Sequence, residues 1–407
     1  MRDEGGFGII SPVMRKSPFF AGAAALAAAV AFADPFGAPP DAKHAWAVHD
    51  DNRPGVKKIV ADGTKAPSDA IVLFDGTAES IVANWCDKKG DPTKWTVDEN
   101  GDLISVRGAG YIFTKRKFSS CQLHVEWASP KEAKGSGQGR GNSGVFLMGN
   151  YEIQVLDSYE TDPDKDPNPN PNYPDGQAGA VYGQNPPAVN PCRAPGEFNT
   201  YDIVFHAPVF NSDGSVKIPA DITVLFNGVL VQDNWKFDGP TGWRNRATYA
   251  RTRSDTGLTV EDKMPLAFQD HGNPVHFRNV WIREIARPEE NTTHGDNYAS
   301  EKDVLELRRA TADRLDAEFD AKWGGEKVGR RLVEAWRIVT YFATPARRER
   351  VAALESEFIA AAKDVGKKEM KDKLGVGSSD MSTWYDHLRK LNLVGAENPV
   401  IQILRKD

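Results

Sequence analysis

The side chains best suited to chemistry lie at alternate positions of short apolar runs. Successive side chains of a β-strand point to opposite faces, so that one face packs on a core while the other meets solvent or a cleft. Residues 121–127, 151–157 and 266–271 alternate in this way. Their polar positions hold Gln122, His124, Glu126, Glu152, Gln154, Gln269 and His271. Because Glu, Gln and His recur on separate runs, they indicate a concave surface whose acids, bases and amides bind sugar hydroxyls.

Other chemical motifs are incomplete or missing. The acidic run that starts at Asp162 resembles the beginning of a calcium loop, but Pro167 stands where the loop needs Gly and Tyr173 where it needs Glu. The glycine-rich segment 135–141 lacks the Lys-Ser/Thr ending of a phosphate loop. The sequence has no GxSxG or HExxH pattern, and the GxGxxG spacing at residues 139–144 lacks the strand-to-helix context of a dinucleotide fingerprint, which argues against serine-hydrolase, zincin and NAD-dependent activities.

Composition excludes several classes of protein. The chain has 407 residues, of which 40% are hydrophobic and 27% charged, so a globular protein is expected and a disulfide-rich miniprotein is excluded. Against 51 Lys and Arg stand 57 Asp and Glu, and the net charge of -6 gives no electrostatic footprint for a nucleic acid partner. Cys86, Cys121 and Cys192 show no CxxC spacing, which argues against a structural zinc site.

The N-terminal region has the pattern of a signal peptide. If translation starts at Met14, two basic residues precede an apolar segment at 19–32, and an A-x-A cleavage pattern ends at Ala33. The apolar segment is shorter than the roughly 20 residues that span a bilayer, and no later segment is long and apolar enough. We therefore expect removal of residues 1–33, no membrane span, no lipid anchor, and a periplasmic or secreted protein. A disulfide from Cys192 to Cys86 or Cys121 becomes feasible there.

The elements that would position the polar residues change in character along the chain. Residues 34–67 are rich in Pro, Ala, Asp and Lys without periodicity, and we expect a linker or arm. Residues 68–287 hold short alternating runs between Gly, Asn, Asp and Pro, which predicts an all-β sandwich or barrel. Asn227-Gly228 lies between two such runs and predicts a tight hairpin, because both central residues of a type I′ turn need positive φ.

Residues 298–407 change to helical spacing with few Gly or Pro. The apolar residues of this pattern include Val304, Leu307, Ala310, Leu315 and Phe319, then Val328, Leu332, Ala335, Trp336 and Val339. Thr344-Pro345 has the pattern of an N-cap and first helical residue. The spacing predicts an α-helical appendage of about three or four helices, with a role in packing or in oligomer formation.

Short motifs in the β region occur in the order and spacing of a known family. They are Leu73-Phe74-Asp75-Gly76, Trp95-Thr96-Val97, Asn100-Gly101, Asn142-Ser143-Gly144-Val145, Tyr151-Glu152-Ile153-Gln154, Gly179-Ala180-Val181-Tyr182, Glu197-Phe198-Asn199, Leu225-Phe226-Asn227-Gly228, Gln269-Asp270-His271-Gly272 and Phe277-Arg278-Asn279. This series resembles the 3-keto-disaccharide hydrolase domain family over about residues 68–287. The resemblance implies a mainly β fold, the concanavalin A-like lectin/glucanase jelly-roll sandwich, to which this chain adds a C-terminal α-helical appendage. The arm and the helical region lie outside it, and the Pro-rich insertion 158–175 is long for the corresponding loop of the family.

The resemblance implies that the protein binds a carbohydrate and cleaves glycosides whose sugar is oxidised at C3. A ketone at C3 acidifies C2–H, so that a base can remove this proton and expel the aglycone from C1 by elimination before water adds. Such a site needs a base, donors to the enolate oxygen and an acid for the leaving oxygen. The expected roles are base for His271, base or acid for Glu152, contacts to the enolate and hydroxyl oxygens for Arg278, Gln154 and Gln269, and proton donation or sugar stacking for Tyr182. Further substrate contacts are expected from His124, Glu126 and Asn142.

Alternative readings of the same residues stay open. Glu152 and Glu126 could form the carboxylate pair of an ordinary glycoside hydrolase. A divalent metal on His271 and Glu152 could stabilise an enediolate, but no ligand set is decisive, and no metal or cofactor is assigned. A non-catalytic, lectin-like carbohydrate-binding module could share the fold, as could a structural protein assembled through its helices. The elimination chemistry also requires an upstream enzyme that oxidises the glycoside at C3.

Overall fold

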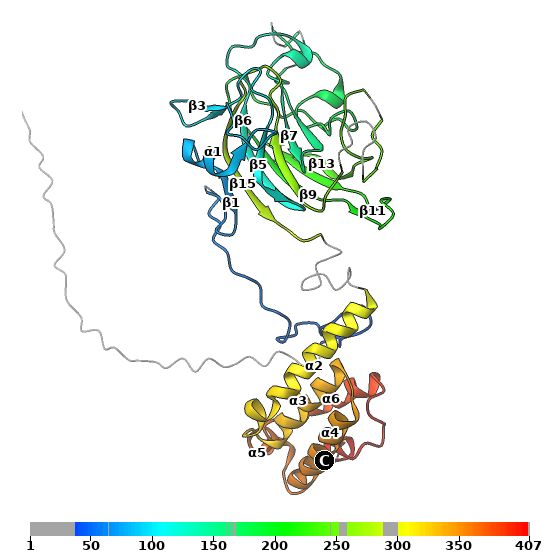
Figure 1. The fold of residues 1–407 in the computed structure, drawn as a ribbon. Coiled ribbons are helices and arrows are strands. Elements are labelled where there is room, and N and C mark those ends of the chain that lie inside the picture. The colour runs from blue at the N-terminus through cyan, green and yellow to red at the C-terminus, as the bar shows by residue number, and fades with distance from the viewer. Residues whose placement is uncertain are drawn as a thin grey trace, which may run out of the picture. The chain divides into compact units, whose positions relative to one another are not determined.

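The computed structural model describes residues 37–63, 65–160, 162, 164–165, 168–244, 246–251, 259–287 and 300–405. These residues form two compact units (Figure 1). The helical unit joins Trp46–Asn52 to the C-terminal helices from Leu315 on, and the sandwich unit joins Pro40–Ala45 to Arg53–Arg314. Among the described residues, no helix is both long and apolar enough to cross a membrane. The predicted signal peptide, residues 1–33, lies outside the described residues.

Two antiparallel β-sheets build the sandwich unit (Figure 1). The larger sheet has the strand order β13-β12-β9-β6-β15-β4-β3, and β1 also pairs with β15. Its strands are β1 (Ile71–Phe74), β3 (Thr96–Val97), β4 (Leu103–Ile104), β6 (Cys121–Ala128), β9 (Asn199–His206), β12 (Asp221–Phe226), β13 (Val229–Lys236) and β15 (His276–Glu284). The smaller sheet has the order β2-β5-β14-β7-β8. Its strands are β2 (Trp85–Cys86), β5 (Ile112–Phe118), β7 (Ser143–Leu147), β8 (Tyr151–Val155) and β14 (Met264–Phe268).

Short elements occupy the connections between the strands. They are α1 (Ala78–Asn84), the 3₁₀ turns η1 (Gly137–Gly139) and η2 (Pro174–Gly176), and the ribbon of β10 (Val209–Phe210) with β11 (Val216–Ile218). The hairpin predicted at Asn227-Gly228 is confirmed, because β12 and β13 pair on either side of it and the two residues have φ of 51° and 78°.

The core lies between the two sheets and follows the alternation of the sequence. On β6, the side chains that face the core are Cys121, Leu123, Val125 and Trp127, while those at the positions between them are half-buried on the outer face. On β8, the core side chains are Tyr151, Ile153 and Val155. Each large apolar side chain buried in this way contributes about 1.5–3 kcal/mol. The structure confirms a mainly β sandwich with a C-terminal helical appendage.

The cysteines do not pair in this sandwich. Cys86, Cys121 and Cys192 are free thiols, so neither of the disulfides considered from the sequence is formed. Cys121 points into the core, where burial raises the pKa of its thiol to about 12. A buried protonated thiol packs as a small apolar side chain.

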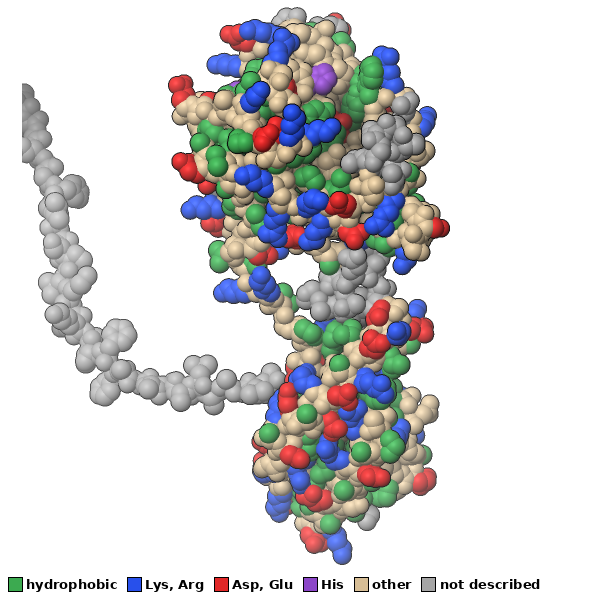
Figure 2. Space-filling model, viewed as in Figure 1, with side chains coloured by type: hydrophobic (Ala, Val, Ile, Leu, Met, Phe, Trp, Pro, Cys, Tyr) green, Lys and Arg blue, Asp and Glu red, His purple; other side chains and the backbone are tan. Residues whose placement is uncertain are grey.

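Amphipathic helices form the C-terminal region. They are α2 (Glu301–Trp323), α3 (Val328–Tyr341), α4 (Pro345–Ala362), α5 (Met370–Leu374), α6 (Ser378–Lys390) and α7 (Pro399–Arg405), with the 3₁₀ turn η5 (Lys367–Glu369). The Thr344 hydroxyl caps α4 by accepting from the Arg347 N–H, as the Thr-Pro motif predicted. More helices form than the three or four expected, because α5 and α7 are too short to show a period. Lys and Arg intermingle with Asp and Glu on the visible face of this region (Figure 2).

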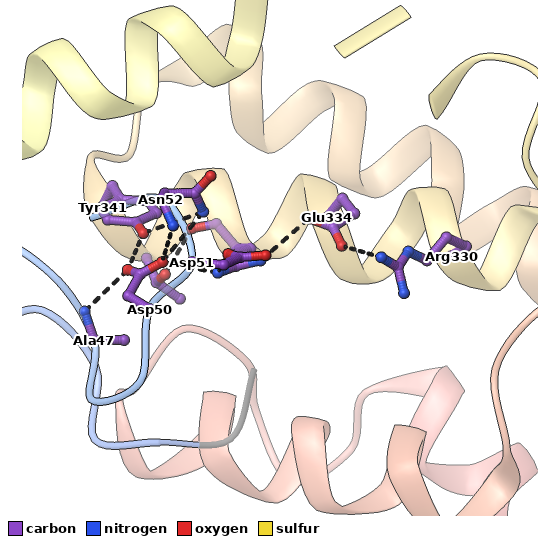
Figure 3. Close-up of polar contacts among 9 residues, drawn as sticks. Ala47, Asp50, Asp51, Asn52, Arg330, Glu334 and Tyr341 are labelled. Carbon is purple, nitrogen blue, oxygen red and sulfur yellow. Dashed lines mark hydrogen bonds and ion pairs between the residues drawn. The ribbon is translucent and has the colours of Figure 1, made fainter. Parts of the chain in front are cut away.

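Part of the predicted linker is built into the helical unit. The Asp50 carboxylate is fully buried and accepts hydrogen bonds from the Arg337 guanidinium at 2.8 Å, the Ala47 N–H at 3.1 Å and the Tyr341 hydroxyl (Figure 3). A buried carboxylate is tolerated only with such partners. Residues 46–52 are therefore a structural component of the helical unit.

Candidate active site

Glu152 stands at the centre of the site because of its place on β8. Tyr151 and Ile153 face the core, so Glu152 points to the opposite side of the smaller sheet. Gly144 on neighbouring β7 leaves room for the carboxyl group, since a Cβ there would come within 2.4 Å of Glu152 Oε1. Glu152 is only 6% exposed, and burial raises its pKa to about 8. Within the described part of the chain, no donor forms a hydrogen bond to its carboxyl group.

A pocket of about 450 Å³ opens over Glu152. It is lined by Tyr111, Gln138, Asn142, Phe146, Glu152, Gln154, Tyr182, Thr241, Gly242, Trp243, Gln269 and His271. We call it the Glu152 pocket. It brings together six of the residues selected from the sequence, namely His271, Glu152, Tyr182, Gln154, Gln269 and Asn142. These six come from β8 and from the loops next to β7, β8 and β14.

Side-chain amides form one wall of the pocket. Gln154 Nε2 donates to Gln138 Oε1 at 3.0 Å and to Asn142 Oδ1 at 3.3 Å. Asn142 Nδ2 donates to Gln138 Oε1 at 2.8 Å and to the backbone carbonyl oxygen of Gln138 at 2.7 Å. Gln154 and Asn142 are each about 1% exposed. Because both hydrogens of each NH₂ group are used within this cluster, Gln154 and Asn142 shape the wall and leave donation to a ligand to other residues.

Tyr111 and Gln269 have hydrogen-bonding groups in the pocket that are not used by other protein groups. Gln269 Nε2 donates to the Tyr111 hydroxyl oxygen at 2.5 Å, and buried Gln269 Oε1 has no partner among the described residues. Burial raises the pKa of Tyr111, so its hydroxyl stays protonated at neutral pH. Since that hydroxyl accepts from Gln269, its own hydrogen can point into the pocket.

His271 lies in the loop that follows β14, at the exposed edge of the pocket. Asp270 shapes this loop, because its carboxylate accepts from the Gly272 N–H at 2.8 Å and from the Gly110 N–H at 3.0 Å. In the described structure, the His271 imidazole makes no hydrogen bond. It can therefore take a proton from a ligand.

Tyr182 stands beside Glu152, to which its backbone is bonded. The Tyr182 N–H donates to the Glu152 carbonyl oxygen at 3.3 Å, and the hydroxyl groups of Tyr182 and Tyr173 lie 2.9 Å apart. Burial and the bond to Tyr173 raise the pKa of Tyr182. The phenol is thus neutral. Its ring can stack on a ligand, and its hydroxyl can donate to a ligand when Tyr173 is the donor in their shared hydrogen bond.

The structure corrects the placement of Arg278, Glu126 and His124, which do not line the Glu152 pocket. They lie on the outer face of the larger sheet, on β6 and β15, with Asp202 of β9 and Asn279. Alternation shows which residues share a strand face, but it does not show which of two sheets a strand joins. The alternative in which Glu126 and Glu152 form a carboxylate pair in one cleft is therefore wrong, because the two residues lie on different sheets. We call this second group the sheet-face network.

Charges in the sheet-face network neutralise one another. Arg278 Nε donates to Glu126 Oε2 at 2.7 Å, and His124 Nδ1 lies 2.7 Å from Asp202 Oδ1. His124, whose Nε2 lies 3.8 Å from Glu126 Oε1, then Asn279 and Arg278 outweigh burial and lower the Glu126 pKa to about 2. Burial alone would lower the pKa of His124, but Asp202 and Glu126 raise it to about 9.

Several lining residues were not selected from the sequence. They are Tyr111, Gln138, Phe146, Thr241, Gly242 and Trp243. Tyr111 directly precedes β5, so a longer alternating window over that strand would have included it. Gln138 lies in the short turn η1 and residues 241–243 lie in a loop, and the local sequence of both carries no period that would signal this role.

A possible metal-binding group lies elsewhere. Among the described residues, Asp98, Asp102 and His276 offer ligand atoms that all lie within 4.8 Å of one another. His276 Nδ1 is 3.3 Å from Asp102 Oδ2, so the three side chains also partner each other. None of them lines the Glu152 pocket.

Known proteins resemble the sandwich unit. The model of a 3-keto-alpha-glucoside-1,2-lyase-like domain matches residues 69–283. A relative named 3-keto-disaccharide hydrolase, from Bacteroides thetaiotaomicron, is 23% identical over 278 residues, which cover 56% of this chain and 84% of that protein. A solved structure from Parabacteroides distasonis, provisionally named a glycosyl hydrolase, is 39% identical with a TM-score of 0.49 and covers 57% of this chain and 92% of its own. A second solved structure from the same organism, with the same provisional name, is 20% identical with a TM-score of 0.37 and covers 53% of this chain and 94% of its own.

Proposed function

The chain belongs to the 3-keto-alpha-glucoside-1,2-lyase-like domain family, and from this premise we propose that the Glu152 pocket cleaves 3-keto-glycosides by elimination followed by hydration. A base removes the proton from C2. The electron pair of the broken C2–H bond then forms the enolate with the C3 ketone. The enolate then expels the C1 oxygen of the aglycone, which takes a proton from an acid. Water adds to C1 of the resulting enone and a proton returns to C2, so that the net reaction is hydrolysis.

The burial of the Glu152 carboxyl group in the pocket, without a hydrogen-bond donor among the described residues, is the observation that carries this proposal. With its pKa raised to about 8 by burial, the carboxyl group holds its proton at neutral pH and can donate it to the leaving oxygen. His271 at the pocket edge is the proposed base for C2–H. After the aglycone leaves, ionised Glu152 can take a proton from the attacking water while protonated His271 returns one to C2. Both residues then regain their starting states.

Stabilisation of the enolate falls to Tyr111 and Gln269. The Tyr111 hydroxyl has a hydrogen free to donate, and Gln269 Nε2 retains a second N–H after its bond to Tyr111. Removing one donor to a developing oxyanion typically costs about 10²- to 10³-fold in kcat. This reassigns to Tyr111 the role that the sequence analysis gave to Arg278.

The lining of the pocket supports a neutral sugar. Among the described residues that line it, there is neither Lys nor Arg. A carboxylate or phosphate on the buried sugar would meet Glu152 without a compensating cation, at a large desolvation cost. We therefore propose an uncharged 3-keto-hexoside as the substrate.

The origin and location of the substrate follow from the same chemistry. A sugar reaches the C3 ketone state by loss of two electrons and two protons from its C3 alcohol, so an oxidising enzyme must act upstream. The signal-peptide pattern supports periplasmic or secreted residence for this protein.

The test compares a 3-keto-glucoside with the matching unoxidised glucoside. The purified protein is incubated with each, with and without chelator, as wild type, His271→Ala and Glu152→Gln. We expect release of the aglycone from the keto substrate alone, with loss in both variants. Chelator sensitivity would add a metal to the mechanism. Absence of turnover together with saturable binding of the glycan would replace this proposal with a lectin-like module.

A further inference from the structure

Trp243 is the most exposed large side chain at the Glu152 pocket. It is 67% exposed although it lines the pocket, and the Arg244 guanidinium lies 4.3 Å from the centroid of its ring. Outside this contact the indole ring meets water, so it lacks much of the free energy that its burial would give. At the edge of a polar pocket, such a ring is suited to contact the apolar face of a ligand.

The segment that carries Trp243 is fixed to the strand that carries Glu152. The Thr241 N–H donates to the Asn150 carbonyl oxygen at 2.9 Å, and the Thr241 hydroxyl donates to the same oxygen at 3.0 Å. The Glu152 N–H in turn donates to the Thr241 hydroxyl oxygen at 3.1 Å. All of these groups are buried. Trp243 thus follows, by two residues, an anchor on β8 next to the proposed acid.

The loop that carries Tyr182 is joined to the same segment. Gly183 has φ of +69°, and a Cβ there would come within 3.3 Å of the Gly242 carbonyl oxygen. Gln184 Nε2 donates to the Gly239 carbonyl oxygen at 3.0 Å. Because Gly183 and Gly242 approach so closely, their neighbours Tyr182 and Trp243 border the pocket from adjacent backbone segments.

We propose that Trp243, with Tyr182 beside it, forms the binding subsite for the sugar ring of the leaving group. The inference rests on the proposed function, because it takes Glu152 as the point where the scissile bond lies. The 3-keto ring must reach buried Glu152, so exposed Trp243 is left to contact the part of the substrate that departs. The C–H face of a pyranose is apolar and packs on an aromatic face. Trp243 is then a specificity-determining residue, which favours glycosides whose leaving group is itself a sugar over those with a small leaving group.

The experiment compares two leaving groups of different size. Kinetics are measured with 3-keto-trehalose and with methyl 3-keto-α-glucoside, for wild type, Trp243→Ala and Trp243→Phe. Trp323→Ala serves as the matched control, because it also removes a tryptophan with a guanidinium over its ring, that of Arg330 at 4.7 Å, in the helical unit. An aromatic contact of ordinary strength predicts a rise in KM of about 3- to 10-fold for 3-keto-trehalose in Trp243→Ala, partly restored in Trp243→Phe. kcat/KM for the methyl glucoside should fall less than kcat/KM for 3-keto-trehalose in Trp243→Ala.

Equal loss on both substrates in Trp243→Ala would overturn the subsite, and so would no loss on either. If wild type turns over neither keto substrate, the proposed chemistry fails separately, and the subsite is tested by calorimetric binding of trehalose. Weaker binding by Trp243→Ala than by Trp323→Ala would then support the subsite. Equal binding by these two variants, or none by wild type, would overturn it.

Discussion

The Glu152 pocket and the sheet-face network contain the same residue types, but the pKa of the glutamate is raised in the pocket and lowered in the network. Each has a glutamate on the outward face of a strand, a histidine and aromatic rings. Glu126 is surrounded by His124, Arg278 and Asn279, which lower its pKa to about 2. Glu152 has burial as the cause of its shift, which raises its pKa to about 8. Perturbed carboxyl groups mark both regions, but only the group without partners keeps capacity for a ligand.

The surroundings of the two glutamates differ in the same sense. In the network, the Arg278 guanidinium covers the Phe198 ring at 3.6 Å, and the His124 ring stacks on Trp281 with centroids 5.1 Å apart. In the network, the aromatic rings and the charged groups therefore have partners within the protein. In the pocket, Trp243 stays 67% exposed despite its contact with Arg244, and the Tyr111 hydroxyl keeps a hydrogen that can point into the pocket. We infer that the network stabilises the larger sheet and that the pocket was left unsatisfied for substrate.

The largest expected effect separates the two glutamates by activity. Glu152→Gln keeps the shape of the side chain but removes the acid, so kcat on a 3-keto-glucoside should fall about 10²- to 10⁴-fold. Glu126→Gln should stay within about twofold of wild type, because that side chain does not touch the pocket. Comparable losses in the two variants would contradict the assignment of function to one region.

The second prediction concerns stability against pH at Glu152. Its folded pKa of about 8 lies above the ordinary 4.5, so below pH 4.5 both folded and unfolded states are protonated and no penalty arises. As pH rises from 4.5 to 8, the unfolded state releases the proton and the folded state keeps it, so stability falls. Urea denaturation at pH 5 and 8.5 should show wild type losing about 4 kcal/mol relative to Glu152→Gln. If the difference in unfolding free energy between wild type and Glu152→Gln were the same at both pH values, Glu152 would be solvated or paired.

The third prediction concerns stability against pH at the sheet-face network, where ionised Glu126 stabilises the fold instead of destabilising it. Glu126 has a depressed pKa of about 2, so its contribution is present above pH 4.5 and lost as pH falls through 2. His124 has a raised pKa of about 9, so its contribution is present below pH 6.5 and lost as pH rises through 9. At pH 5.5 both act, and Glu126→Gln should cost about 1–2 kcal/mol of unfolding free energy, less than the shift alone implies because solvent screens the carboxylate. The cost should shrink at pH 3 and at pH 9.5, and an unchanged cost would show that charge is not its source.

Local pattern predicted strand faces but not sheet membership. The alternation of 121–127 and 151–155 correctly placed Glu126 and Glu152 away from the core. β6 joins the larger sheet because it pairs with β9 and β15, which come more than 70 residues later in the sequence. Such pairings depend on long-range contacts that no short window contains. Loop residues such as Trp243 were missed for the related reason that loops have no period to read.

Arg278 provides the last and smallest prediction, because it is where the sequence and the structure disagree most directly. The sequence suggested that it binds the enolate oxygen, yet its side chain is 47% exposed and bonded to Glu126 on the larger sheet. An exposed ion pair contributes about 0.2–1 kcal/mol, so Arg278→Met should lower stability by no more than about 1 kcal/mol. Its kcat and KM on the keto substrate should equal those of wild type. A loss of kcat with stability retained would show that Arg278 reaches the reacting sugar after all, and would join the two regions into one site.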